Sequence, residues 1–267
     1  MGPRIIDTHT HPMLLQSQQM FDTPHPPEDY LEEIEGLGIV HAAALVMAPR
    51  GNLPLTRELN DGVLELASRS GGMFFPVCSV HPFDGEDALS ELRRVAEHGA
   101  RWLKLHPITQ DFDVADPQVA AVVKEASRVD LPVLFDAYCP WDPAQPGKFI
   151  QLAREIPDSK LILAHAHGPH FIDLLAHEIL SHFSWWPRRV WFDISATTVL
   201  LADGPLVEQF VWVLRKVGID RVLFGSDYPY DSPRVALDAV RSLGFSSDEL
   251  QAVLYDNAAD LLGLPAR

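Results

Sequence analysis

The sequence predicts a (β/α)8 barrel, the TIM-barrel fold, built as a single domain over residues 1–267 with a short helical extension at its C-terminus. Two observations predict this fold. Short apolar runs rich in Val, Ile, Leu and Phe alternate with longer segments of helical periodicity, and the alternation occurs eight times. The length also fits, because barrels of this kind typically have about 250 residues in one domain.

The predicted elements follow one another along the chain without an internal repeat or a long polar linker. Glycines mark several helix ends, since Gly36 and Gly38 follow the first helix and Gly99 follows the third. The predicted strands cover residues 4–7, 40–47, 73–80, 101–105, 132–135, 161–164, 190–194 and 221–224. The predicted helices cover residues 27–34, 56–70, 88–98, 117–129, 148–155, 171–183, 206–217 and 233–243, with two short helices in 247–264. An open, doubly wound sheet is the alternative, but the chain lacks the glycine-rich first turn typical of that fold.

Composition restricts the partners of the protein. Lys and Arg number 21 against 37 Asp and Glu, so the formal net charge is −16, which argues against binding to nucleic acid or an anionic membrane. No apolar run is long enough to span a membrane and no signal peptide is visible. Cys78 and Cys139 are expected to be reduced thiols in a cytoplasmic protein. We therefore expect a small-molecule substrate, and the sequence leaves homo-oligomerisation open.

The first predicted strand leads into Asp7, His9 and His11. Residues two apart in an extended strand point to the same side, so the two histidines can converge on one metal ion, with Asp7 below them. Alone, this pattern is weak, because two hydrogen-bonded loop histidines would look the same. It gains weight from its position, since the carboxyl ends of barrel strands form the active-site mouth.

Strands six and eight contribute further candidates to the same mouth. Barrel closure makes strand eight the neighbour of strand one, which brings Asp227 beside the two histidines as a metal ligand or proton acceptor. The alternative for Asp227 is a helix N-cap. After strand six, His165 is expected to bind metal or transfer a proton. His167 is expected either to bind substrate or to be an ordinary loop residue.

Strands four and five end in polar residues as well. Lys104 and His106 point to one side and are candidates for substrate binding, because a lysine inside a barrel needs a polar partner. The alternative for Lys104 is a structural salt bridge. Asp136 can ligate a metal, orient a histidine or cap a loop. Tyr138 and Tyr228 follow strands five and eight and are candidates for an aromatic substrate rim.

These motifs together resemble the amidohydrolase superfamily, specifically its amidohydrolase-related branch, which includes carboxymuconate-semialdehyde decarboxylase-type enzymes. The similar segments run the length of the chain and are Ile6-Asp7-Thr8-His9-Thr10-His11, Lys104-Leu105-His106-Pro107, Leu163-Ala164-His165, Phe224-Gly225-Ser226-Asp227-Tyr228-Pro229 and the closing segment 256–264. The resemblance implies that His9, His11 and Asp227 are metal ligands and that His165 assists proton transfer.

The resemblance also implies a divalent metal cofactor, with Zn²⁺ favoured. One position departs from the family pattern, because Asp136 stands where the family usually has a metal-binding histidine at the end of strand five. Aspartate also ligates zinc, but as a harder ligand it shifts the preference toward Mn²⁺ or Mg²⁺.

Three functions are compatible with these residues. The first is hydrolysis of a small ester, lactone or amide by metal-activated water, with Asp227 or His165 accepting the proton. The second is metal-dependent, non-oxidative decarboxylation of a small aromatic or unsaturated acid. The third is a barrel that binds a ligand without catalysis, which the departure at Asp136 would explain.

Overall fold

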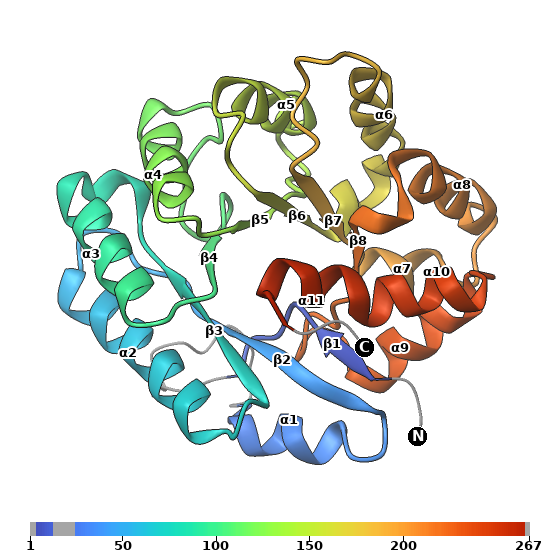
Figure 1. The fold of residues 1–267 in the computed structure, drawn as a ribbon, viewed down its shortest axis with the longest axis horizontal. Coiled ribbons are helices and arrows are strands. Elements are labelled where there is room, and N and C mark those ends of the chain that lie inside the picture. The colour runs from blue at the N-terminus through green and yellow to red at the C-terminus, as the bar shows by residue number, and fades with distance from the viewer. Residues whose placement is uncertain (1–3, 13–24, 265–267) are drawn as a thin grey trace.

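The computed structural model describes residues 4–12 and 25–264 and contains the predicted barrel of parallel strands (Figure 1). All eight strands pair in sequence order within one sheet. They are β1 (Ile5–Asp7), β2 (Ile39–Leu45), β3 (Phe74–Ser79), β4 (Trp102–Leu105), β5 (Val133–Asp136), β6 (Leu161–Ala164), β7 (Val190–Asp193) and β8 (Val222–Leu223). The predicted fold class is therefore confirmed, although β8 is only two residues long.

Backbone hydrogen bonds beyond the short strands join the two ends of this sheet. The Thr8 N–H donates to the Phe224 carbonyl over 3.0 Å, and the Asp227 N–H donates to the His9 carbonyl over 2.8 Å. A parallel bridge between Thr10 and Tyr228 continues this pairing. The segments that follow β1 and β8 therefore lie side by side, as barrel closure predicted.

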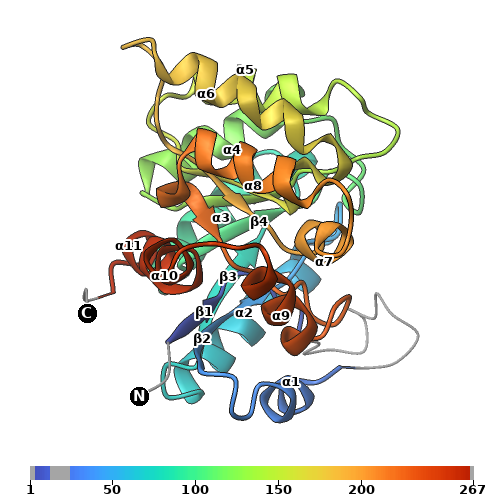
Figure 2. The ribbon, with the colours of Figure 1, turned by 90° about the vertical axis from the view of Figure 1, so that its right-hand side faces the viewer.

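Helices surround the strands (Figures 1 and 2). They are α1 (Pro27–Glu33), α2 (Leu53–Arg69), α3 (Glu86–Glu97), α4 (Pro117–Arg128), α5 (Gln145–Glu155), α6 (Leu175–Ser181), α7 (Thr197–Leu201), α8 (Val207–Val217), α9 (Pro233–Ser242), α10 (Ser247–Gln251) and α11 (Asn257–Leu262), with short 3-10 turns η2 (Pro82–Asp84) and η4 (Ile219–Arg221). Several begin at a proline in the first turn, where its missing N–H costs nothing.

The helix predicted at residues 171–183 is wrong in its first four residues, 171–174. That region forms a 3-10 segment, η3 (His165–Leu174), before α6 begins. Left-handed dihedrals at Ala166, His167 and Gly168, followed by Pro169, prevent a regular helix there. The sequence also missed α7, because five residues are too few to show helical periodicity.

Two apolar clusters form the core. The larger lies between strands and helices, and the smaller fills the barrel interior, where it includes Ile6, Trp102 and Leu134. The C-terminal extension belongs to the smaller cluster, because Ala258 and Leu262 of α11 pack against those interior side chains. The π-helical turn η5 (Ala252–Asp256), just before α11, contacts β1 and β8. The predicted extension therefore completes the packing of the barrel interior.

This packing predicts a stability effect at Leu262, whose side chain is 3% exposed. Replacing it with alanine leaves a cavity, and Leu262→Ala should lower the free energy of unfolding by about 2–5 kcal/mol. The exposed neighbour Asp260 provides a control, since Asp260→Ala removes no buried apolar group. Thermal or urea unfolding measures the difference. Equal stabilities of the two variants would show that the extension is only loosely attached.

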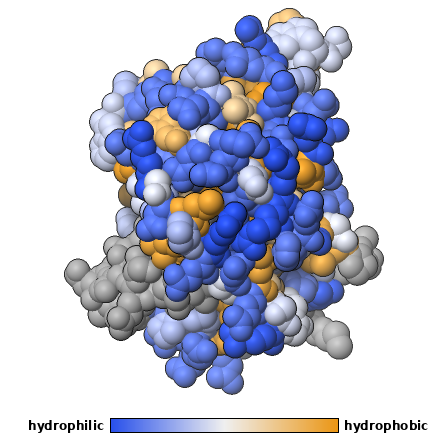
Figure 3. Space-filling view, turned by 90° about the vertical axis from the view of Figure 1, so that its left-hand side faces the viewer, coloured by the Kyte–Doolittle hydropathy of each residue, from blue (hydrophilic) through white to orange (hydrophobic). Residues whose placement is uncertain are grey.

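The face drawn in Figure 3 is mostly hydrophilic, with apolar residues in separate patches. None of the helices formed by the described residues has the length and apolar character needed to cross a membrane.

Candidate metal centre

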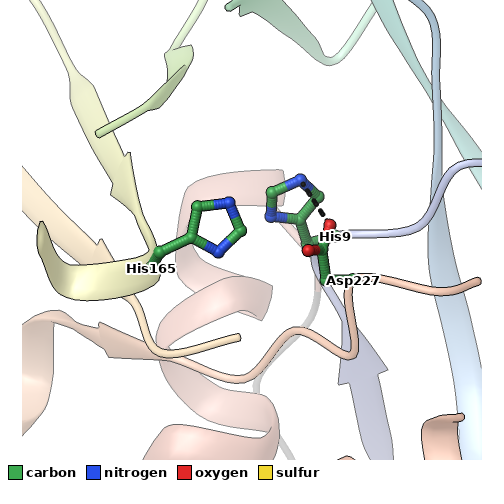
Figure 4. Close-up of side chains that lie close together, drawn as sticks. All are labelled: His9, His165 and Asp227. Atoms are coloured by element: carbon green, nitrogen blue, oxygen red, sulfur yellow. Dashed lines mark ion pairs between the residues drawn. The ribbon is translucent and has the colours of Figure 1, made fainter. Parts of the chain in front are cut away.

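The carboxyl ends of β1, β6 and β8 bring His9, His165 and Asp227 together (Figure 4). Each offers one potential ligand atom, and these atoms lie within 4.8 Å of one another. In Figure 4 the His9 and Asp227 side chains lie together and His165 faces them from the start of η3. The sequence predicted all three, and the fold brings them to one place.

His11 joins this group through its ring nitrogen. Its Nε2 lies 3.2 Å from His9 Nε2 and 3.3 Å from Asp227 Oδ1, and His9 Nε2 lies 3.4 Å from the same oxygen. Ligand atoms about 2.1 Å from a tetrahedral zinc lie roughly 3.4 Å apart. The three atoms therefore already form a triangle of the size that a zinc ion requires. This donor set fits a divalent ion.

Backbone conformation supports a functional role for two of these residues. His165 and Asp227 both have a φ of 61°, in the left-handed region that non-glycine residues seldom adopt. Such conformations persist only where the surrounding structure enforces them, and they concentrate at functional sites.

Asp193 and Ser195 hold the His9 ring from behind. Asp193 Oδ2 lies 2.6 Å from His9 Nδ1, and Ser195 Oγ lies 3.2 Å from the same nitrogen. The Ser195 N–H donates to Asp193 Oδ1 over 2.8 Å. An Nδ1–H that donates to the carboxylate leaves His9 Nε2 with the lone pair that a metal needs. Neither residue was predicted from the sequence, although Asp193 ends β7 just as Asp136 ends β5.

Burial determines the charge state of these groups. It raises the pKa of Asp193 to about 6, even though His165 and Ser195 oppose the shift. It also lowers the pKa of His9 far below the usual value, helped by the positive charge of Lys104. His9 is therefore a neutral imidazole, which is the form that binds a metal.

Lys104 lies beneath the centre and is fully buried. Its Nζ is 3.1 Å from His9 Nε2. Burial lowers the pKa of Lys104, and the charges of Asp136, Asp227 and Asp193 oppose that shift. Lys104 does not line the cavity described below, so its predicted contact with substrate would require a direct approach to the centre.

Asp136 lies between two histidines. Its Oδ2 is 3.2 Å from His165 Nε2 and 3.5 Å from His106 Nε2. Burial alone would raise the pKa of Asp136, but His106, His165 and Lys104 together hold it well below the usual value. Burial likewise opposes a charge on His165, yet Asp227, Asp136 and Asp193 raise its pKa to about 9. These interactions favour the alternative in which Asp136 orients a histidine.

A cavity of about 450 Å³ opens over the centre. Among the predicted residues, Asp136, Tyr138, His165 and Asp227 line it. His106 lies one step away, in contact with Asp136.

Besides Lys104 and His106, two further predicted substrate-binding residues, His167 and Tyr228, do not line this cavity. His167 is buried, its Nδ1–H donates to the Ala137 carbonyl over 2.9 Å, and its ring stacks on Phe149. Tyr228 is buried against Tyr30. Left-handed dihedrals at residues 165–167 and at Asp227 redirect the chain, so the alternation of a regular strand no longer applies.

Asp7 also departs from the expected geometry. It was expected below His9 and His11, but its carboxylate accepts from the Tyr30 hydroxyl over 3.0 Å and from the Ser226 hydroxyl over 2.7 Å. β1 ends at Asp7, so the two-residue periodicity does not extend to the histidines. Asp7 therefore joins the segment after β8 to α1 and supports the centre indirectly.

Gly225 provides a test of how tightly the centre is built. A Cβ added there would lie 2.7 Å from both His9 Cβ and Asp193 Oδ1. Because His9 Cβ is fixed to the backbone, Gly225→Ala must displace one of these segments, and we expect divalent metal affinity to fall by roughly tenfold or more. Gly147→Ala is the control, since a Cβ at Gly147 meets nothing within 4 Å. Equilibrium metal titration measures the metal affinity of both folded variants.

Several known proteins resemble this chain in sequence or in fold. A curated relative, the uncharacterised protein y4mH of Sinorhizobium fredii, is 28% identical over 137 residues, which span 43% of this chain and 42% of the relative. The crystal structure of 5-carboxyvanillate decarboxylase from Sphingomonas paucimobilis matches with a TM-score of 0.74 and 17% identity over 99% of this chain and all of that chain. A putative 2-pyrone-4,6-dicarboxylic acid hydrolase from Pseudomonas putida matches with a TM-score of 0.70 and 20% identity over the full length of both.

The two structural matches establish a shared fold. The family model described as amidohydrolase matches residues 6–264, nearly the entire chain. Its span includes the histidines after β1, His165 after β6 and Asp227 after β8. The chain therefore belongs to this amidohydrolase family.

Proposed function

We propose that the protein is a metal-dependent hydrolase that acts on a small ester, lactone or amide. The observation that carries this proposal is the position of Asp227, whose carboxylate contacts His9 and His11 and also lines the cavity. A carboxylate placed there can accept a proton from water that attacks a bound carbonyl carbon.

The proposed metal ligands are His9 Nε2, His11 Nε2 and an Asp227 oxygen, and we propose zinc because this nitrogen-rich triangle suits it. When bound, the ion would polarise the carbonyl oxygen and make water more acidic. Asp193 would keep His9 in the tautomer required for binding. On the opposite wall, His165 would exchange a proton with the leaving group while Asp136 and Ser195 orient its ring.

The polar end of the cavity carries charges of both signs. Asp136 and Asp227 line that end together with His165, whose pKa is raised to about 9, and the described part of the chain contributes neither Lys nor Arg to the lining. A carboxylate entering the cavity would meet two like charges, but it would also meet the His165 imidazolium and a bound metal ion. Decarboxylation of an anionic acid is therefore the second candidate function, and the test below separates it from hydrolysis.

The test compares reactions after loading the protein with Zn²⁺, Mn²⁺ or Mg²⁺. We expect hydrolysis of members of an ester, lactone and amide panel, loss of activity after chelation, and recovery when metal is restored. Carbon dioxide release from aromatic acids without ester hydrolysis would replace the proposal with a decarboxylase. Ligand binding without turnover at any metal loading would support a non-catalytic barrel.

A further inference from the structure

The wall of the cavity beyond the metal centre is apolar and partly aromatic. Loops that follow five consecutive strands build it. Its side chains outside the polar end include Ile108, Tyr138, Pro140, Trp141, Pro169, Thr197, Leu200 and Tyr230. A volume of about 450 Å³ accommodates a small organic molecule. The ionisable groups nearest the centre, Asp136, His165 and Asp227, are therefore concentrated at one end of the cavity.

Three large side chains of this wall are exposed. Trp141 is 71% exposed, Tyr230 66% and Leu200 63%, although each lines the cavity. Exposed apolar side chains grouped around a concave site are typical of ligand-binding surfaces, because a bound molecule covers them.

Tyr138 occupies a fixed position in this wall. Its ring lies over Gly168, where an added Cβ would come within 3.0 Å of the ring. Gly168 has a φ of +57°, so the absence of a side chain both permits the turn and lets the ring lie against the backbone. One aromatic face is thus held in place beside the more exposed Trp141.

The described lining of the cavity contains neither Lys nor Arg, and the cationic His165 lies at the polar end, against Asp136. Lys104 lies beneath the metal centre, against His9. Lys148 is bound by Asp113 and Asp142, each over 2.7 Å. An anionic group placed against this wall would lose part of its hydration without gaining a Lys or Arg as a partner.

We infer that the substrate carries its single reactive carbonyl at one end and a neutral, aromatic or similarly apolar group at the other, and that a second, anionic group at the far end is excluded. This inference rests on the proposed function for the carbonyl end only. The far end is defined by the apolar lining and by the absence of Lys and Arg among the described lining residues.

The test uses two ketones that differ only at the far end, 2-acetylnaphthalene and 6-acetyl-2-naphthoate. Neither can be hydrolysed, so binding is measured apart from catalysis, by calorimetric titration of the metal-loaded protein. We expect the neutral ketone to bind at least tenfold more tightly than the carboxylate. Equal or tighter binding of the carboxylate, or no binding of either ketone, would overturn the inference.

Two variants test whether the wall causes the difference in affinity between the two ketones. Trp141→Ala should weaken the neutral ketone severalfold, because it removes an aromatic face. Leu200→Arg, at an exposed position, should narrow or reverse the preference by supplying the missing cation. Exposed Leu206→Arg adds the same charge away from the lining and should change neither affinity. If the protein binds the neutral ketone more tightly but hydrolyses no ester, the proposed function is refuted and the inference stands. If it hydrolyses esters but binds both ketones equally, the inference is refuted and the proposed function stands.

Discussion

Asp227→Asn should reduce kcat/KM for ester hydrolysis by roughly 10²–10⁴-fold, the range that a positioned general base contributes. Asparagine keeps the size of the side chain and one oxygen that can face His9 and His11. It removes the charge and the ability to accept a proton from water. Because Asp227 lines the cavity as well as contacting both histidines, its loss affects the reaction directly.

The metal content of this variant distinguishes the two proposed roles of Asp227, general base and metal ligand. If the carboxylate acts mainly as a base, the variant should retain at least part of its metal at saturating ion concentrations while remaining inactive. If it acts only as a ligand, excess metal should restore the rate. Asp238→Asn, at an exposed position of α9, is the matched control and should behave as the parent protein. An Asp227→Asn variant with unchanged kcat/KM would exclude the proposed mechanism.

The barrel could be predicted from the sequence because each strand is a short, continuous apolar run with a helical segment after it. Few folds other than the barrel fit that pattern when it occurs eight times. Strand order then predicted that Asp227 would lie beside His9 and His11, and the Asp227–His9 backbone hydrogen bond shows that contact. Long-range proximity followed here from topology alone.

Side-chain direction could not be predicted where the chain leaves strand geometry. His165 and His167 were expected on one face, yet His165 lines the cavity and His167 stacks on Phe149. Left-handed dihedrals at both residues cause the divergence, and nothing in the local sequence requires them at histidine. Tyr228 was similarly misplaced, because the unusual backbone at Asp227 turns its ring toward Tyr30.

Asp193 was missed for a different reason. It ends a strand, as Asp136 does, so its position alone would have made it a candidate. The sequence could not show how β7 and β1 lie relative to each other across the barrel, which determines whether Asp193 reaches the His9 ring. Only the three-dimensional arrangement shows that its carboxylate lies 2.6 Å from His9 Nδ1.

Asp193→Asn should weaken divalent metal binding by about 10–100-fold, the usual effect of removing a carboxylate that orients a histidine ligand. The carboxylate and His9 are both fully buried, so water cannot take over the hydrogen bond without moving other groups. Asparagine can still accept the Nδ1 proton through its oxygen, and the ring should therefore stay in place. The substitution removes the negative charge that makes His9 Nε2 a stronger electron-pair donor to the metal.

The decisive measurement is metal affinity together with the rate at saturating metal. Loss of an orienting group should raise the metal concentration needed for activity more than it lowers the rate once the site is filled. Asp203→Asn, exposed on the segment after α7, carries the same charge change and should leave affinity unchanged. If Asp193→Asn instead abolished activity at full metal occupancy, Asp193 would have a direct part in the reaction. Its position behind the His9 ring, away from the residues that line the cavity, argues against that outcome.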